Sequence, residues 1–407
     1  MSDVIKKEGI DAKIVILGLQ HTFVMFGATV LVPIITGIDV GVALFAAGVG
    51  TLIFHVLTKF KVPVFLGSSF AFIPAILTVA NNYGGDLAYA TGGLLVAGLV
   101  YVVVSIIFTF VSSDVLHKIL PPHVTGPIII LIGMVLAPTA IDNATGGWGV
   151  AIITFAVGVF VRVGFARMGW KFLSLLPVLF ALIAGYIVAV IAGIVDFSSV
   201  MEASWVGVPG FMFPKFAGGA MAIVVPVALV TMVEHFGDVI AIGNVVKKDF
   251  FKDPGVNRTL LGDGIATSIS ALLGGPANTT YSENTGAVAL TGVYNPVVMR
   301  IAAVFAIVLA VIPKFTALIG TIPAPVIGGI SILLFGMISA IGIRNMVDAQ
   351  VDMDKPASLI IVAVMLVLGL GGAELTIGTA TFSGLALAAV VGILLNIIIN
   401  FQSFKST

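Results

Sequence analysis

The sequence lacks cysteine and is poor in charged residues. Without Cys the chain can form neither disulfides nor thiolate metal sites, and cysteine nucleophiles are excluded. Its five histidines show no metal-ligand spacing, and we find no Ser-His-Asp arrangement and no phosphate-binding glycine loop. Charged residues make up 9% of the 407 residues, whereas soluble domains have roughly 25%. These absences argue against an enzyme, a metalloprotein and, at zero net charge, a nucleic-acid binder.

Long apolar runs dominate what is present. Hydrophobic residues make up 59% of the chain, and a membrane-spanning helix needs about 20 predominantly apolar residues. The polar start, Met1–Lys13, has no signal-peptide pattern, so we expect the first apolar run to remain as a helix. We predict an all-α polytopic membrane protein with fourteen spans. These are residues 14–38, 40–57, 62–79, 87–111, 121–141, 149–161, 173–195, 217–242, 259–273, 278–290, 296–312, 322–341, 358–370 and 382–399.

The distribution of basic residues orients these spans. With the N-terminus inside, only Lys215 and Lys314 of the 19 Lys and Arg residues fall on the outer side, and Lys6, Lys7 and Lys405 are among those inside. An excess of basic residues in cytoplasmic loops is typical of membrane proteins. We therefore expect a multi-pass protein of the cell membrane with both termini in the cytoplasm.

The two halves of the chain carry a related motif. The pattern P-x-x-V-x-G-x-I begins at Pro121 in the fifth span and recurs at Pro323 in the twelfth. The third and tenth spans are both short and rich in Gly, Pro and hydroxyl residues. Spans that correspond seven apart indicate inverted repeats, and paired broken segments are typical of secondary transporters. We also expect Gly126 and Gly328–Gly329, within the motif, to keep a sliding surface smooth.

Acidic residues lie inside two of the apolar runs. Glu234 falls in residues 223–242, and Glu283 falls in residues 278–290. A carboxylate at the centre of a bilayer costs about 2.5–3.5 kcal/mol even on the lenient insertion scale, so such residues usually face an internal cavity. Asp238 follows Glu234 by one helical turn, either beside it in that cavity or as an interfacial acid near Lys247. We expect Glu234, Asp238 and Glu283 to carry the coupling proton.

Two further candidate residues, His235 and Phe70, could instead have a purely structural role. His235 points about 100° away from Glu234 on a helix, which favours packing or a positioning role. Phe70 lies at the first break, where it is either a core residue or a stacking surface for a flat ligand.

Several motifs resemble those of one transporter family. The segments are Gln20-His21, residues 25–33 (MFGATVLVP), residues 67–72 (GSSFAF), Glu234-His235-x-Gly237, residues 244–249 (NVVKKD) and residues 278–286 (NTTYSENTG). Together they resemble the nucleobase–cation symporters of the nucleobase–ascorbate family, from about residue 14 to residue 400. The likeness is greatest to the uracil-transporting bacterial members, which have Glu at the position of Glu283. This chain departs from them in having Asp238 in place of His and Ser282 in place of Gly.

The resemblance implies an architecture of two inverted seven-helix repeats, with short strands in the third and tenth spans. It implies a core domain formed by residues 14–111 and 217–312 and a gate domain formed by residues 121–195 and 322–399. Substrate would be held between core and gate, and the core would move against the gate during transport. It implies no cofactor other than H⁺, and as partners only a nucleobase and membrane lipid, with a homodimer left open.

The resemblance also implies a substrate site. Glu234 and Glu283 would accept hydrogen bonds from the pyrimidine N–H groups, and Phe70 would stack near the ring. Backbone amides around Phe70 and Ser282 would serve the carbonyl oxygens, while Ala28 and Tyr281 would complete the site.

Proton-coupled uracil uptake is therefore the leading expectation. A purine symporter for xanthine or uric acid is the first alternative, because acidic residues at the place of Asp238 also occur among purine carriers. An anion transporter of the same fold is a second alternative, which two carboxylates at the site disfavour. A channel is disfavoured because no ring of pore-lining charge is evident.

Overall fold

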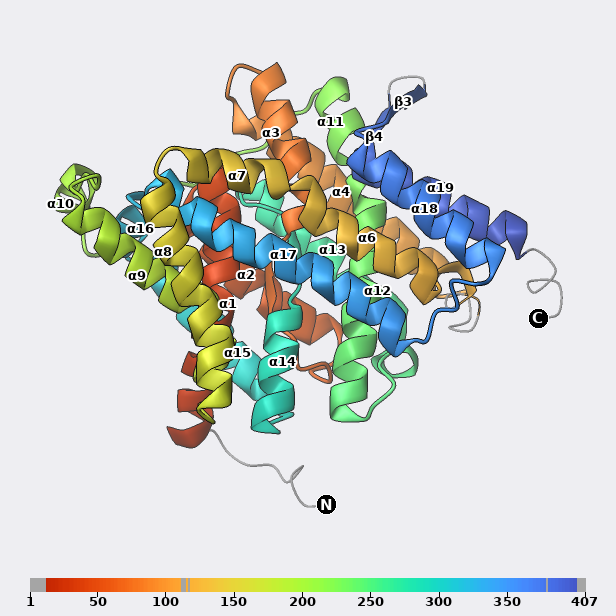
Figure 1. The fold of residues 1–407 in the computed structure, drawn as a ribbon, viewed down its shortest axis with the longest axis horizontal. Coiled ribbons are helices and arrows are strands. Elements are labelled where there is room, and N and C mark those ends of the chain that lie inside the picture. Colours follow the sequence, from red (N-terminus) through yellow and green to blue (C-terminus); the bar gives the residue numbers. More distant parts are fainter. Residues whose placement is uncertain (1–11, 111–114, 116–117, 378–379, 401–407) are drawn as a thin grey trace.

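The computed structural model describes residues 12–110, 115, 118–377 and 380–400 (Figure 1). Lys6, Lys7 and Lys405, which contributed to the predicted orientation, and Val111, the predicted end of the fourth span, lie outside the described residues.

Helices fill most of the first half. They are α1 (Ala12–Thr36), α2 (Val40–Leu57), α3 (Ile73–Asn82), α4 (Leu87–Ile107), α6 (Pro122–Val135), α7 (Ala137–Thr145), α8 (Trp148–Val159, continued by a π-helical turn to Phe165), α9 (Pro177–Ile191) and α10 (Ser198–Glu202). Local chemistry sets several of these boundaries. The Asp39 and Asp86 carboxylates cap α2 and α4 by accepting from Val42 N at 2.8 Å and Ala88 N at 3.0 Å.

Helices also fill most of the second half. Its helices are α11 (Gly218–Val224), α12 (Val227–Val246), α13 (Val256–Leu272), α14 (Ser282–Thr291), α15 (Val297–Ala310), α16 (Pro313–Gly320), α17 (Ala324–Asp348), α18 (Pro356–Leu370) and α19 (Gly384–Ile399). Among the described residues, seven helices or helix pairs are long and apolar enough to cross a membrane, and α15 with α16, bent by 83°, would make an eighth. Shorter apolar helices, including α9, α18 and α19, occupy other predicted spans. The helical multi-pass prediction is confirmed, and the count of fourteen stays a prediction.

Two short antiparallel strands pair in the interior. β1 (Leu66–Ser68) pairs with β2 (Asn278–Thr280), with Gly67 opposite Thr279. Every residue of both strands is buried. The prediction of strands in the third and tenth segments is therefore confirmed.

A second pair of strands was not expected. β3 (Glu374–Ile377) and β4 (Ala380–Ser383) form a hairpin before α19, so the helix predicted to begin at Phe382 begins at Gly384. Gly372, with φ of +64°, follows the end of α18. The β-branched and aromatic residues that follow, including Thr376 and Phe382, favour strands. The long apolar run of α19 concealed this signal in the sequence.

Helix packing forms two sets of contacts (Figure 1). In one set α13 packs against α4 and α2, and α15 packs against α2 and α1. In the other, α17 packs against α6, α7 and α8, and α18 packs against α19. The division into a core and a gate domain stays a prediction.

The glycines of the repeated motif lie inside the second set. A Cβ on Gly328 would lie 2.4 Å from the backbone N of Ala144 on α7, and one on Gly329 would lie 2.4 Å from the carbonyl O of Ala151 on α8. A Cβ on Gly126 would lie 2.4 Å from the Met346 side chain on α17. The expectation that these glycines smooth a sliding surface is wrong, because each one lets α17 approach a helix of its own set.

Candidate functional site

The paired strands β1 and β2 bring the starts of two half-helices to one place. β1 leads through a 3₁₀ turn, Phe70–Phe72, into α3, while β2 leads through Tyr281 into α14. The pairing extends beyond the strands, since Ser69 N donates to Ala277 O at 2.9 Å and Tyr281 N donates to Phe65 O at 3.2 Å. The first amides of a helix have no partner within the helix. Both half-helices therefore begin beside the paired strands, with first amides that have no partner within their own helix.

Equivalent threonines hold the strands to the surrounding helices. Leu66 N donates to Oγ1 of Thr51 on α2 at 2.9 Å, and Asn278 N donates to Oγ1 of Thr267 on α13 at 3.1 Å. The Ser68 hydroxyl on β1 donates to the carbonyl of Thr29 on α1 at 3.1 Å. These bonds satisfy backbone groups that would otherwise be buried without partners, so the irregular segments are fixed inside the protein.

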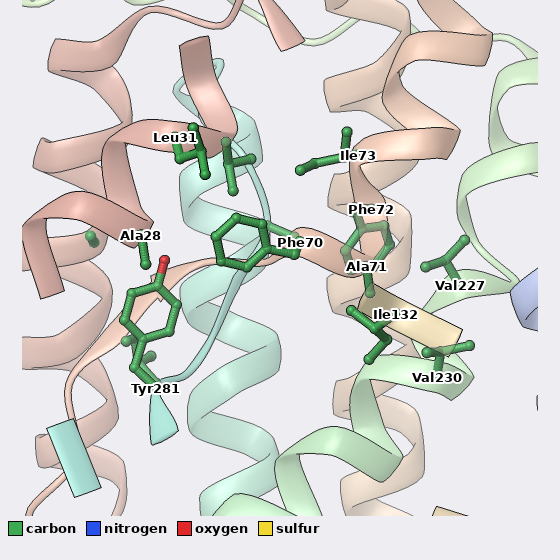
Figure 2. Close-up of a cluster of buried hydrophobic side chains, with 14 of the residues drawn as sticks. Ala28, Leu31, Phe70, Ala71, Phe72, Ile73, Ile132, Val227, Val230 and Tyr281 are labelled. Carbon is green, nitrogen blue, oxygen red and sulfur yellow. The ribbon is translucent and has the colours of Figure 1, made fainter. Parts of the chain in front are cut away.

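Aromatic and small residues gather at the start of the half-helices. Figure 2 shows Ala28, Phe70 and Tyr281 close together where α1, the 3₁₀ turn and the start of α14 meet. Tyr281 donates its hydroxyl to the carbonyl of Ser68 at 3.0 Å. Its ring lies against Gly67, where a Cβ would come within 2.3 Å of it. The Phe70 ring meets the Phe335 ring of α17 edge-on, with centroids 6.0 Å apart.

Both glutamates lie at this junction. Glu283 is in the first turn of α14, and Glu234 is on α12, which packs against α14 and the 3₁₀ turn. Both residues are half-buried. Oε2 of Glu234 is buried and has no hydrogen-bond partner among the described residues. A buried carboxylate oxygen without a donor is costly, so Glu234 is a strong candidate to receive one from a ligand.

Asp238 is tied to the strands. Thr280 on β2 donates its hydroxyl to Oδ2 of Asp238 at 2.9 Å, and Asp238 is 8% exposed. The alternative of an interfacial acid near Lys247 is therefore wrong. Glu234 lies close enough to Asp238 and Glu283 to interact with both electrostatically. The structure thus brings all three predicted proton carriers into one region.

The sequence reasoning missed a fourth acid, Asp263. It is fully buried on α13, and its Oδ2 lies 3.3 Å from Nδ1 of His235, which is also fully buried. His235 therefore contacts a buried carboxylate, in line with the positioning alternative. The available signal was an aspartate within the predicted span 259–273.

Other features add little to the site. Ser282 is the first residue of α14, and its side chain lies outside what the structure describes. Among residues 12–110, 115, 118–377 and 380–400, no group of three or more acidic, His or Cys side chains could hold a metal ion. One cavity, of about 480 Å³, is lined by Gly169–Leu173 and the end of α14. A second cavity, of about 450 Å³, is lined by residues of α4, α11 and α12 and by Phe382. Neither cavity includes a predicted site residue.

Half-helices that begin at paired strands, with acidic residues at their junction, are typical of one class of protein, the secondary transporters with broken spans. A family model described as the permease family matches residues 12–378. The chain is 45% identical over 399 residues to the uracil permease of Bacillus caldolyticus, covering 94% of this chain and 91% of that protein. It is 39% identical over 399 residues to the uracil permease of Escherichia coli K12, covering 95% of this chain and 91% of that protein.

The chain therefore belongs to the permease family, as the resemblance of its motifs indicated. It is a multi-pass membrane transporter and not an enzyme.

Solved structures show the same fold at low sequence identity. Murine Slc26a9, an anion transporter in the inward-facing state, matches with a TM-score of 0.73 at 9% identity, over 98% of this chain and 70% of that one. The transmembrane domain of the cyanobacterial bicarbonate transporter BicA matches with a TM-score of 0.61 at 14% identity, over 95% and 97% of the two chains. At these identities the likeness concerns the fold alone.

Proposed function

We propose that this protein imports uracil across the cell membrane by proton symport. The observation that carries the proposal is that Glu234, Glu283 and Phe70 lie on elements that meet at the paired strands β1 and β2. The chain that holds them is 45% identical to a uracil permease. Oε2 of Glu234, which is buried and has no hydrogen-bond partner in the part of the chain that the structure describes, can accept a hydrogen bond there.

The chemistry of uracil matches this junction. Its flat ring carries two N–H donors and two carbonyl acceptors. Glu234 and Glu283 accept from the N–H groups, and amides at the starts of the half-helices, around Phe70 and Ser282, donate to the carbonyls. Phe70, with Ala28 and Tyr281 beside it, contacts the ring.

Transport follows from a division into core and gate. In the proposal fourteen spans form two inverted repeats, and residues 14–111 and 217–312 move as a core against a gate of residues 121–195 and 322–399. The matching roles of Thr51 and Thr267, in the second and ninth segments, support the repeat. The two sets of helix contacts support the division, and the contact of Phe70 with Phe335 lies between the sets.

We assign the coupling of uracil transport to H⁺ to three acidic residues of the proposed site. Glu234, Asp238 and Glu283 are the groups that exchange the proton, because they are the acidic side chains on α12 and α14 beside the paired strands. Both termini lie in the cytoplasm in this proposal, and H⁺ is the only coupling ion.

A purine symporter is the second candidate, and Asp238 is the residue that favours it. An anion substrate is disfavoured, because the junction presents carboxylates. The test is uptake of radiolabelled uracil into proteoliposomes of the purified protein, in competition with unlabelled xanthine, uric acid, thymine and bicarbonate. Strong inhibition by unlabelled uracil, with weak inhibition by the purines and none by bicarbonate, is expected. Stronger inhibition by xanthine or uric acid than by uracil would replace the proposed substrate with a purine.

A further inference from the structure

An extended, strongly apolar strap joins α10 to α11. We define the strap as residues 203–217 (ASWVGVPGFMFPKFA), which form neither helix nor strand. Nothing in the proposed transport cycle accounts for its composition. Six of its large apolar side chains are exposed, namely Trp205 at 72%, Val206 at 79%, Val208 at 78%, Phe211 at 40%, Phe213 at 81% and Phe216 at 56%.

The strap backbone is fixed to the ends of three helices, of which α4 is long and apolar enough to cross a membrane. Gly207 N donates to the carbonyl of Val311, which directly follows α15, at 3.2 Å. Met212 N donates to the carbonyl of Leu273, which directly follows α13, at 3.1 Å. Lys215 N donates to Ala88 O in the first turn of α4 at 2.8 Å. The strap therefore lies at the level where these helices end, and that level is the membrane interface for a helix that spans the bilayer.

Helix α16 lies at the same level. It is turned by 83° from α15, so it runs nearly along the membrane plane if α15 crosses the membrane. Lys314, in its first turn, donates its backbone N to Ser204 O at 3.0 Å and its Nζ to Ala203 O at 3.3 Å. α10 packs against α16 (Figure 1). The start of the strap and α16 thus form one platform parallel to the membrane surface.

The charges beside the strap fit an interface between lipid and water. Lys314 Nζ lies 5.3 Å from the centroid of the Trp205 ring. Lys215 Nζ lies 2.7 Å from Oδ2 of Asp86 and 5.7 Å from the Tyr89 ring centroid. Tryptophan and tyrosine with neighbouring lysines are enriched where acyl chains meet headgroups. Helix α9 also presents exposed apolar side chains, with Ile187 53% and Ile191 80% exposed.

We propose that the strap is an interfacial membrane anchor, with its exposed aromatic and aliphatic side chains inserted into the headgroup and upper acyl region of the adjacent leaflet. A water-exposed loop would gain nothing from six exposed large apolar side chains on a fixed backbone. Lipid is the occupant, because the strap is hydrogen-bonded to helix ends and its exposed tryptophan lies beside a lysine, a combination typical of the boundary between acyl chains and headgroups. The inference does not depend on the identity of the substrate.

Tryptophan fluorescence tests the proposal directly, because the chain has only three tryptophans. Replacing Trp148 and Trp170 by Phe leaves Trp205 as the sole reporter. The full-length variant is reconstituted in phosphatidylcholine vesicles, with or without lipid spin-labelled at the top of the acyl chain, and with iodide on both sides of the membrane. The control reporter is Asp354→Trp, at an exposed position between α17 and α18, in a chain whose three native tryptophans are Phe.

The expected result is that spin-labelled lipid quenches most of the Trp205 emission and iodide quenches little, with the reverse for the reporter at position 354. Quenching of Trp205 by iodide as strongly as at position 354 would place the strap in water and overturn the proposal. Protection from both quenchers would mean that protein covers the strap, such as a second copy, and would also overturn it. If the Phe variants do not express, Trp205→Cys in this cysteine-free chain, labelled with an environment-sensitive fluorophore, gives the same readout.

Discussion

The hydroxyl of Thr280 on β2 donates a hydrogen bond to Oδ2 of Asp238 on α12 across 2.9 Å. This bond joins the strand that leads to Glu283 with the helix that carries Glu234. The relative position of the two glutamates therefore depends on a contact between residues 42 positions apart in the sequence.

Thr280→Val removes this bond while keeping the shape of the side chain. A hydrogen bond to a charged group contributes about 1.5–3 kcal/mol, so we expect a lower melting temperature and weaker uracil binding. Thr279→Val is the matched control, since the Thr279 hydroxyl on the same strand has no hydrogen-bond partner among the described residues. Equal losses in the two variants, measured by thermal unfolding in detergent and equilibrium binding, would contradict the positioning role of Thr280.

Glu283→Gln should weaken uracil binding several-fold or more. The amide replaces one acceptor oxygen by a donor, and an unpaired ligand donor in a closed site costs about 1–3 kcal/mol. Isothermal titration of purified protein measures the change. Glu202→Gln, in exposed α10, is the control and should bind as the unaltered protein does. Unchanged affinity in Glu283→Gln would remove this residue from the site.

Proton coupling predicts a response to the proton gradient alone. Uracil uptake into proteoliposomes should rise when the outside is made acidic and should collapse when a protonophore is added. In Asp238→Asn the same gradient should accelerate uptake less, if Asp238 belongs to the group that exchanges the proton. Uptake that ignores pH and protonophore but follows external Na⁺ would show that the coupling ion is not H⁺.

Gly328→Ala should destabilise the protein. The added Cβ would lie 2.4 Å from the backbone N of Ala144, which cannot move as a flexible side chain can, and overpacking of this kind costs about 1–3 kcal/mol. Gly336→Ala on the same helix is the control, because a Cβ there meets no atom within 4 Å. Melting temperature, binding and transport should fall together in Gly328→Ala alone. A variant that binds uracil normally and is stable but does not transport it would restore the sliding-surface interpretation.

The ion pair at the start of α4 predicts a pH dependence. The hydrogen bond from Lys215, together with that from Ala88 N, lowers the pKa of Asp86 below its ordinary value of 3.8. A carboxylate whose pKa is lowered by folding stabilises the protein above its unfolded pKa, and this contribution is lost as pH falls through the folded pKa. Asp86→Asn should therefore melt below the unaltered protein at neutral pH, and the difference should vanish in strong acid. A difference that is constant over this range would assign the effect to the shape of the cap.

Several features followed from local sequence. Uninterrupted apolar runs between polar turns determine helices such as α2, whose bounds match the predicted ones. The Gly- and Pro-rich stretches before Phe70 and Asn278 predicted the breaks, because such residues weaken a helix in any context. Glu234 and Glu283 were identified as candidate site residues because each is an isolated carboxylate in an apolar run. The free-energy cost of burying a charge depends little on the fold.

Tertiary structure decided what depends on distant neighbours. The partners of Gly328 are on α7, and no local pattern could show that this glycine packs inside its own set of helices. The contact of Asp263 with His235 joins α13 to α12. The pairing of Gly67 with Thr279 brings two breaks from opposite halves of the chain together. Residue types and hydropathy determine where a helix forms or breaks, whereas each of these contacts depends on how helices pack in three dimensions.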